Sequence, residues 1–123
     1  MYAGSLTTSG NLPHPATAFT TRENALFSQL NGVVATSSAI YTSDYYNHYV
    51  RKVFISQNRV ENFAGNGNSG MTDGTGTAAT VAQPAMMTSN DDRTMLYMSQ
   101  SHGIRMMNPS TKYVMTIAGS TAT

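Results

Sequence analysis

The stretch "NHYVRKVFISQNRVENFAGNG" (residues 47–67) aligns without a gap with "SHGIRMMNPSTKYVMTIAGST" (residues 101–121). In each copy a histidine is followed two positions later by an aliphatic-Arg pair. The alanine of an Ala-Gly pair then follows the histidine at the same spacing in both copies (64 − 48 = 118 − 102). A third ending of this kind, Tyr2-Ala3-Gly4, opens the chain. Agreement over so many positions indicates an internal duplication, whose period, counted between the alanines, is 64 − 3 = 61 and then 118 − 64 = 54.

Each copy contains four short extended segments separated by turn residues. The segments are 32–37, 39–44, 49–55 and 59–65 in the first copy, and 84–89, 94–100, 103–108 and 113–119 in the second. The breaks, among them "DYYN" (44–47) and "NPST" (108–111), are rich in the residues that favour turns. The pattern predicts an all-β fold in which each copy is a four-stranded antiparallel meander. One short helix is the alternative for residues 20–30, "TTRENALFSQL".

Length and composition restrict the protein class further. The chain has 123 residues, 11% of them charged, with a formal net charge of +1 and no cysteine. This length suits one domain, and the weak charge argues against a nucleic-acid partner, whose binding needs a basic face. We find neither a secretory leader nor an apolar run long enough to span a membrane, so the chain as given is expected to be soluble. Its compartment is not indicated, and an extracellular location stays open because missing cysteines neither support nor exclude secretion.

The repeat also resembles a known family. In NHL repeats a blade ends on an apolar residue followed by Ala-Gly, passes through a crossing with Asp-Gly, and reaches a proline before the innermost strand. It then turns through Asn-His into a strand carrying Ile-Arg-Lys. The matching residues in the second copy are Ala64, Gly65, Asp73, Gly74, Pro84, His102, Ile104, Arg105 and Pro109. Those in the first copy are Gly32, Tyr41, Asp44, Asn47, His48, Val50, Arg51, Lys52, Ala64 and Gly65.

Two of the departures from the pattern concern an acidic residue; the others are Leu30 in the place of the proline of the first copy and a turn before His102 that is two residues shorter. The crossing of the first copy lacks Asp-Gly, and the second copy has Gln100 where the first has Asp44. The resemblance implies a β-propeller of about two NHL-type blades, blade one at about 5–65 and blade two at about 66–119. Rings of this kind close with four to eight blades, so the ring is incomplete in one chain. Either the chain is a fragment of a longer propeller, or copies of it associate into a ring or a filament.

Four residues are candidates for a binding site. His48 and His102 occupy the same turn in the two copies, where histidine serves as a ligand, a general base or simply a turn residue. Arg51 and Arg105 form a basic rim for an anionic partner, or else pair locally within the sheet. The turn "SNDDR" (89–93) supplies too few alternating oxygens for calcium, and no P-loop or nucleophile motif is present. We therefore predict no catalytic residue, no metal ligand and no cofactor.

Three function classes follow, in this order. A non-catalytic scaffold that binds a protein, a glycan or another macromolecule is what the resemblance implies first. A structural subunit whose blades pack against other copies is favoured by the incomplete blade count and the low charge. A propeller enzyme of the lyase or lactonase type comes third. We expect no enzymatic activity, and we expect the partners to be other copies of the chain, further blades of a longer chain, or a protein or glycan ligand.

Overall fold

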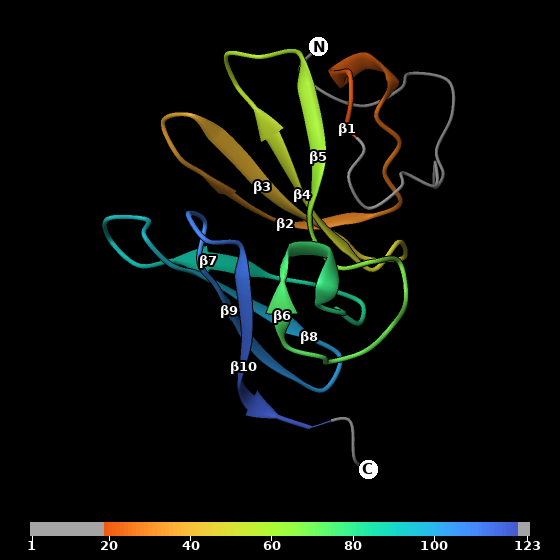
Figure 1. Ribbon diagram of the computed structural model, residues 1–123, viewed down its shortest axis with the longest axis vertical. Coiled ribbons are helices and arrows are strands. Elements are labelled where there is room, and N and C mark those ends of the chain that lie inside the picture. Colours follow the sequence, from red (N-terminus) through yellow and green to blue (C-terminus); the bar gives the residue numbers. More distant parts are fainter. Residues whose placement is uncertain (1–18, 121–123) are drawn as a thin grey trace.

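The computed structural model describes residues 19–120 and contains two antiparallel β-sheets, one above the other (Figure 1). Sheet 1 has the strand order β1-β5-β4-β3-β2, and sheet 2 has the corresponding order β6-β10-β9-β8-β7. The strands of sheet 1 are β1 (Phe19–Thr20), β2 (Leu30–Ala35), β3 (Ala39–Asp44), β4 (Tyr49–Phe54) and β5 (Arg59–Ala64). Those of sheet 2 are β6 (Gly74–Thr75), β7 (Met87–Ser89), β8 (Leu96–Gln100), β9 (Gly103–Met107) and β10 (Tyr113–Gly119). The all-β, blade-like architecture expected from the repeat is confirmed.

The main difference from the expected meander is a fifth strand in each sheet. β6 pairs with β10 through Val114 and Tyr113, and β1 pairs with β5 at the matching place. Each added strand has two residues and comes from the segment that leads into the meander. It satisfies part of an outer strand edge that would otherwise present unpaired backbone groups. Tyr2-Ala3-Gly4, and with it the start of blade one, lies outside the described residues.

The helix considered for residues 20–30 is reduced to a single 3-10 turn, η1 (Arg22–Asn24). Ala25 is already extended, with φ −67° and ψ 132°. Its side chain is buried against Val53 and Val60, with Phe27 packed beside them. The apolar residues of this segment therefore cover sheet 1 from an extended chain, which places them there without a helix.

The two sheets share one hydrophobic core. Its members from sheet 1 and its turns include Val34, Tyr41, Val50 and Phe63, and those from the second repeat are Ala79, Val81, Met87, Leu96, Met98, Met107 and Val114. Since successive strand residues point to opposite faces, this core uses one face of each sheet. The two sheets use opposite faces for this core. In sheet 2 the buried face carries Arg105, whereas in sheet 1 the equivalent residue, Arg51, lies on the face that points away from sheet 2. The contact between the sheets is therefore head to tail.

The crossing at residues 65–80 connects the end of β5 with sheet 2. Gly65 and Gly76 have φ values of 95° and 58°, a region that glycine enters without steric cost. The Gly65 N–H donates to the Gly76 carbonyl, and the Gly76 N–H donates to the Lys112 carbonyl. The crossing also contains the second 3-10 turn, η2 (Gly76–Ala78), which packs against β5. It is therefore an ordered connection that touches both repeats.

Candidate functional site

Arg51 is the centre of a buried polar cluster in sheet 1. Its side chain comes from β4, the residue is 0% exposed, and Nη2 lies 3.1 Å from the Asp44 Oδ2 at the end of β3. Asp44 also accepts hydrogen bonds from the Ser28 N–H and from Asn47 Nδ2, at 2.8 and 2.9 Å. Burial raises the pKa of Asp44 and lowers the pKa of Arg51, while their pairing acts in the opposite direction on both groups. The pair ties the segment before β2 to the strands beneath it.

Arg105 occupies the same position in sheet 2 but has a different carboxylate. Asp73, on the crossing, lies 3.3 Å from Nη2. Three further oxygens accept from the guanidinium: the Thr72 and Thr80 carbonyls and the Gln100 side-chain oxygen. Burial lowers the pKa of Arg105, and the Asp73 charge opposes that shift.

The two departures that concern an acidic residue compensate for each other, because each repeat supplies the carboxylate for its buried arginine from a different position. Sheet 1 uses Asp44, and sheet 2 has Gln100 in that place and takes its carboxylate from the Asp-Gly of the crossing. Each buried arginine therefore forms an ion pair with one carboxylate. Neither guanidinium reaches the surface, so Arg51 and Arg105 do not build a basic rim, and the local pairing considered as the alternative accounts for both.

The two histidines have unequal environments. His48 has φ 58° and its Nδ1 accepts the Gln83 N–H at 3.1 Å, which links the β3–β4 turn to the approach to β7. His102 is exposed, and its Nδ1 lies 3.0 Å from the Ser101 hydroxyl. Among residues 19–120, neither histidine makes a hydrogen bond to the side chain of Arg51 or Arg105. His48 therefore links the two repeats through a hydrogen bond, and His102 is a residue of a surface turn.

We expect His48→Ala to lower the free energy of unfolding by about 1–2 kcal/mol. The substitution removes an acceptor from a partly buried N–H, and alanine is less tolerant than glycine or asparagine of a positive φ. His102→Ala is the matched control and should change stability by less than about 0.5 kcal/mol. Urea unfolding followed by circular dichroism measures both, and equal losses in the two variants would rule out the linking role.

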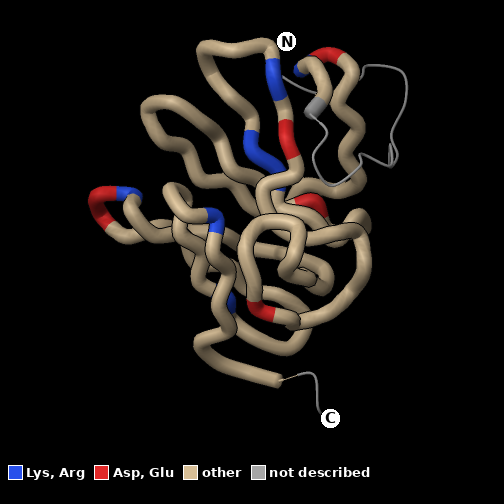
Figure 2. Tube along the Cα trace, viewed as in Figure 1, with Lys and Arg blue, Asp and Glu red and all other residues tan. Residues whose placement is uncertain are grey.

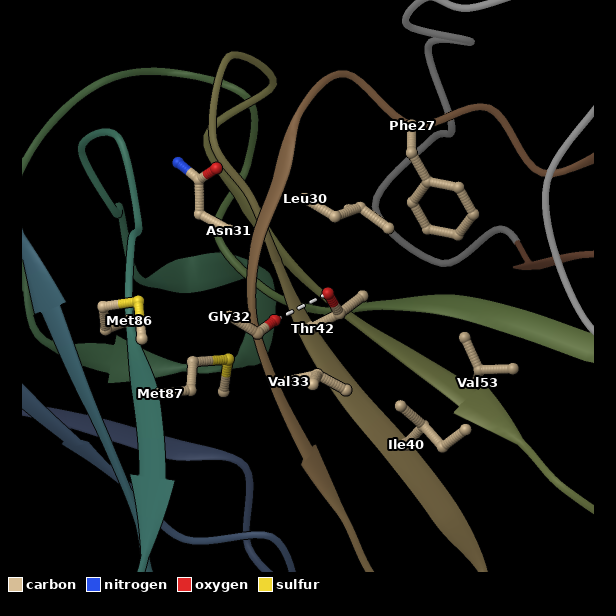
Figure 3. Close-up of a pocket in the computed structure, with 10 residues that line it drawn as sticks. All are labelled: Phe27, Leu30, Asn31, Gly32, Val33, Ile40, Thr42, Val53, Met86 and Met87. Carbon is tan, nitrogen blue, oxygen red and sulfur yellow. Dashed lines mark hydrogen bonds between the residues drawn. The ribbon is translucent and has the colours of Figure 1, made fainter.

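An apolar opening lies on the side of sheet 1 that faces away from sheet 2. We call the uncovered part of this side, next to β2, the open face of sheet 1. The opening there is lined by Phe27, Leu30, Val33, Ile40 and Val53 (Figure 3); Leu30 and Val33 are 47% and 62% exposed, whereas Val53 is buried by the segment before β2. The opening has a volume of about 550 Å³, and Met86 and Met87 of the second repeat close it at one side. Its polar groups are few, and the Thr42 hydroxyl is already bonded to the Gly32 carbonyl at 2.8 Å. The lining therefore suits contact with apolar side chains, and it offers few polar groups that could take part in a reaction.

A second apolar surface lies on the far side of sheet 2. We call it the open face of sheet 2; its residues are Met86, Thr88, Tyr97, Ser99, Ile104, Met106, Tyr113, Met115 and Ile117. None of these side chains is charged. Ile104 and Ile117 are 44% and 46% exposed, although their counterparts in sheet 1, Val50 and Phe63, are fully buried against sheet 2. The open face thus has the composition of a blade-to-blade contact without a partner among the described residues.

The sequence contained the signal for this surface. The gapless repeat alignment places Met106 against Lys52 and Met115 against Glu61, so the second copy loses both charges. Met87, Met98 and Met107 fill the shared core. Met86 does not, because it is 66% exposed. In the Met86-Met87 and Met106-Met107 pairs, adjacent residues point to opposite faces, which places one member of each pair outside the shared core.

Comparison with known proteins adds no relative, since the chain matches no protein-family model and no curated protein. Among residues 19–120, no helix is long and apolar enough to cross a membrane. The same residues contain no group of three or more histidine, cysteine or acidic side chains placed to hold a metal ion. The two open sheet faces, with their exposed apolar side chains, form the candidate site.

Proposed function

We propose that this chain is a non-catalytic scaffold of the β-propeller type, resembling NHL-repeat proteins, whose open sheet faces bind further blades. The observation that carries the proposal is the uncharged open face of sheet 2, with Ile104 and Ile117 exposed where the equivalent residues of sheet 1 are buried. An exposed apolar patch of this kind marks an interaction surface in soluble proteins. The partner it fits is another β-sheet face.

A second copy of the chain supplies such a face, and this supports the self-assembly alternative. Inside the chain, the face of sheet 1 that carries Val50 and Phe63 packs against the face of sheet 2 that carries Arg105. Among residues 19–120, two faces of these same two kinds remain uncovered: the far side of sheet 2, and the part of the far side of sheet 1 next to β2. A second copy can therefore dock its open face of sheet 1 on the open face of sheet 2, and repetition of that contact yields a ring or a filament.

The contact between copies would differ from the internal one at the inner strand as well as at Met106 and Met115, which replace Lys52 and Glu61. Met86 stands where sheet 1 has Gly32, and a Cβ at Gly32 would come within 2.5 Å of the Ala85 carbonyl of the adjacent strand. A methionine needs more room, so the inner strands of two copies would lie further apart than β2 and β7. The opening of about 550 Å³ on the partner's open face of sheet 1 has space for that flexible side chain.

The test is the mass of the purified chain by sedimentation velocity over a range of concentrations. The wild-type chain should form discrete multiples of the monomer mass. The double substitution Ile104→Lys and Ile117→Lys should weaken association about 100-fold, because it places two like charges in the middle of the apolar contact. Both side chains are exposed, so the variant should fold.

The matched control adds the same two charges elsewhere. Ser56→Lys and Gln57→Lys lie in the exposed β4–β5 turn, outside both open faces. This variant should associate as the wild type does. A wild-type chain that stays at the monomer mass at every concentration would exclude self-assembly. Equal weakening in the two variants would mean that net charge, and not the open face, controls association.

A further inference from the structure

A polar cleft lies where the turns of the two sheets meet, apart from both open faces. It has a volume of about 430 Å³. The β2–β3 turn contributes Ser37 and Ser38, the β9–β10 turn contributes Ser110, and Asp92 and Arg93 come from the β7–β8 turn. Lys52 of β4 reaches the cleft from sheet 1. Because its walls come from both repeats, the cleft exists only when the two sheets are packed together.

Lys52 is half-buried, and two aromatic rings lie near its ammonium. Nζ lies 4.6 Å from the centre of the Phe54 ring and 5.6 Å from that of Tyr41. Among residues 19–120, no hydrogen bond or ion pair is made by this nitrogen. Cation–π contacts hold an ammonium in place but leave its three N–H donors free for an anionic oxygen.

The charges around Lys52 leave a positive excess. Glu61, its neighbour across the strands, is shared by Arg59 and Lys112 at 3.1 and 3.3 Å. One carboxylate therefore serves two cations, and Lys52 is a third. Burial lowers the pKa of Lys52, Lys112 and Arg59 lower it further, and Glu61 alone opposes them. In Figure 2, blue segments of β4 and β5 lie above the junction of the sheets, and the blue segment of the β9–β10 turn lies below it.

The one carboxylate that lines the cleft among the described residues is already engaged. Asp92 accepts hydrogen bonds from the Thr94 N–H and the Thr94 hydroxyl, at 3.2 and 2.7 Å. These bonds hold the pKa of Asp92 below its ordinary value. Arg93, next to it, adds a cation at the rim. Asp91 precedes them in the turn but does not line the cleft.

We propose that this cleft binds an oxyanion, the sulfate or carboxylate group of an acidic ligand, with Lys52 as the main contact and Arg93 and the serine hydroxyls around it. The repeat supports a binding role over a structural one. Met106 stands at the equivalent position of sheet 2, so the sheet does not need a charge there to fold. The proposal is independent of docking at the open faces.

The test is a titration with sodium sulfate at low ionic strength, followed by NMR of the backbone amides of Ser37, Ser38 and Ser110. Low ionic strength matters because salt screens such contacts. Sulfate should shift these amides in the wild-type chain, and Lys52→Met should weaken binding about tenfold or more. Lys52→Arg keeps the charge and should retain most of the affinity.

Arg22→Met is the matched control, because it removes the same charge from the exposed η1 turn. It should leave sulfate binding unchanged. Equal affinity in the wild type and Lys52→Met would overturn the proposal, and so would the absence of any shift with sulfate and with a hexaglutamate peptide. Peptide binding that competes with sulfate would assign the site to an acidic protein partner, and sulfate binding alone would assign it to a free oxyanion.

A second variant protects the test if Lys52→Met does not fold. Arg93 has φ 58°, which suits glycine, so Arg93→Gly removes a cation of the cleft without straining the turn. It should weaken sulfate binding by about threefold, as expected for a more exposed cation. Unchanged binding in this folded variant would also overturn the proposal.

Discussion

Asp44→Asn is expected to lower the free energy of unfolding by about 3–5 kcal/mol, which is the cost of leaving a buried charge without its partner. Arg51 is 0% exposed, and the Asp44 carboxylate is the only charge that it pairs with among residues 19–120. Asparagine keeps the shape, but its one oxygen can replace either Oδ1, which accepts the Ser28 N–H, or Oδ2, which lies beside Arg51. The loss therefore combines the missing charge with one missing acceptor. Urea unfolding followed by circular dichroism measures the effect.

Asp73→Asn is the matched control in sheet 2. Arg105 keeps three neutral acceptors after the substitution, whereas Arg51 in Asp44→Asn keeps the Leu26 carbonyl as its neutral acceptor. The Asp73 side chain is also 40% exposed, so water screens its charge. We expect a loss of about 1–2 kcal/mol. Equal losses at the two positions would show that the exchange of carboxylates between the repeats has no energetic consequence.

The strands could be predicted because the repeat and its turn residues are local signals. The pairing of the arginines could not, although the sequence showed that each repeat lacks one of the two carboxylates: the first has no Asp-Gly in its crossing, and the second has Gln100 in the place of Asp44. Asp73 is 32 residues from Arg105 in sequence, and only the path of the crossing brings them together. The two-residue strands β1 and β6 were missed for the same reason, since their position depends on the folded edge of β5 and β10 and not on their own residues.

The faces of the sheets were predictable in part. Alternation along a strand places Met106 and Met107 on opposite sides, and the alignment with Lys52 and Glu61 identifies the second copy as the less charged one. What the alternation does not say is which side meets the other sheet. That depends on the head-to-tail order of the repeats, which the structure supplies through the shared core.

Gly32→Ala is expected to lower the free energy of unfolding by about 3 kcal/mol, at the upper end of the cost of overpacking a core. A Cβ at this position would lie 2.5 Å from the Ala85 carbonyl oxygen and 2.7 Å from the Met87 nitrogen. Both are backbone atoms, so β2 and β7 would have to separate. The strands belong to different sheets, and their separation would loosen the shared core; urea unfolding measures the loss.

Gly70→Ala is the control, because its Cβ would also lie 2.5 Å from its nearest atom. That atom is the Thr80 hydroxyl oxygen, which can rotate away at the cost of the 2.9 Å hydrogen bond from the Thr72 N–H. Losing that bond costs about 1 kcal/mol, and the reduced entropy of the unfolded chain offsets part of it. A Gly32→Ala chain that unfolds at the same urea concentration as Gly70→Ala would mean that the two repeats are not held at the close approach of β2 and β7. If Gly32→Ala alone is destabilised, the junction between the repeats is rigid at its inner strands, and Met86 marks the point where a further blade must pack differently.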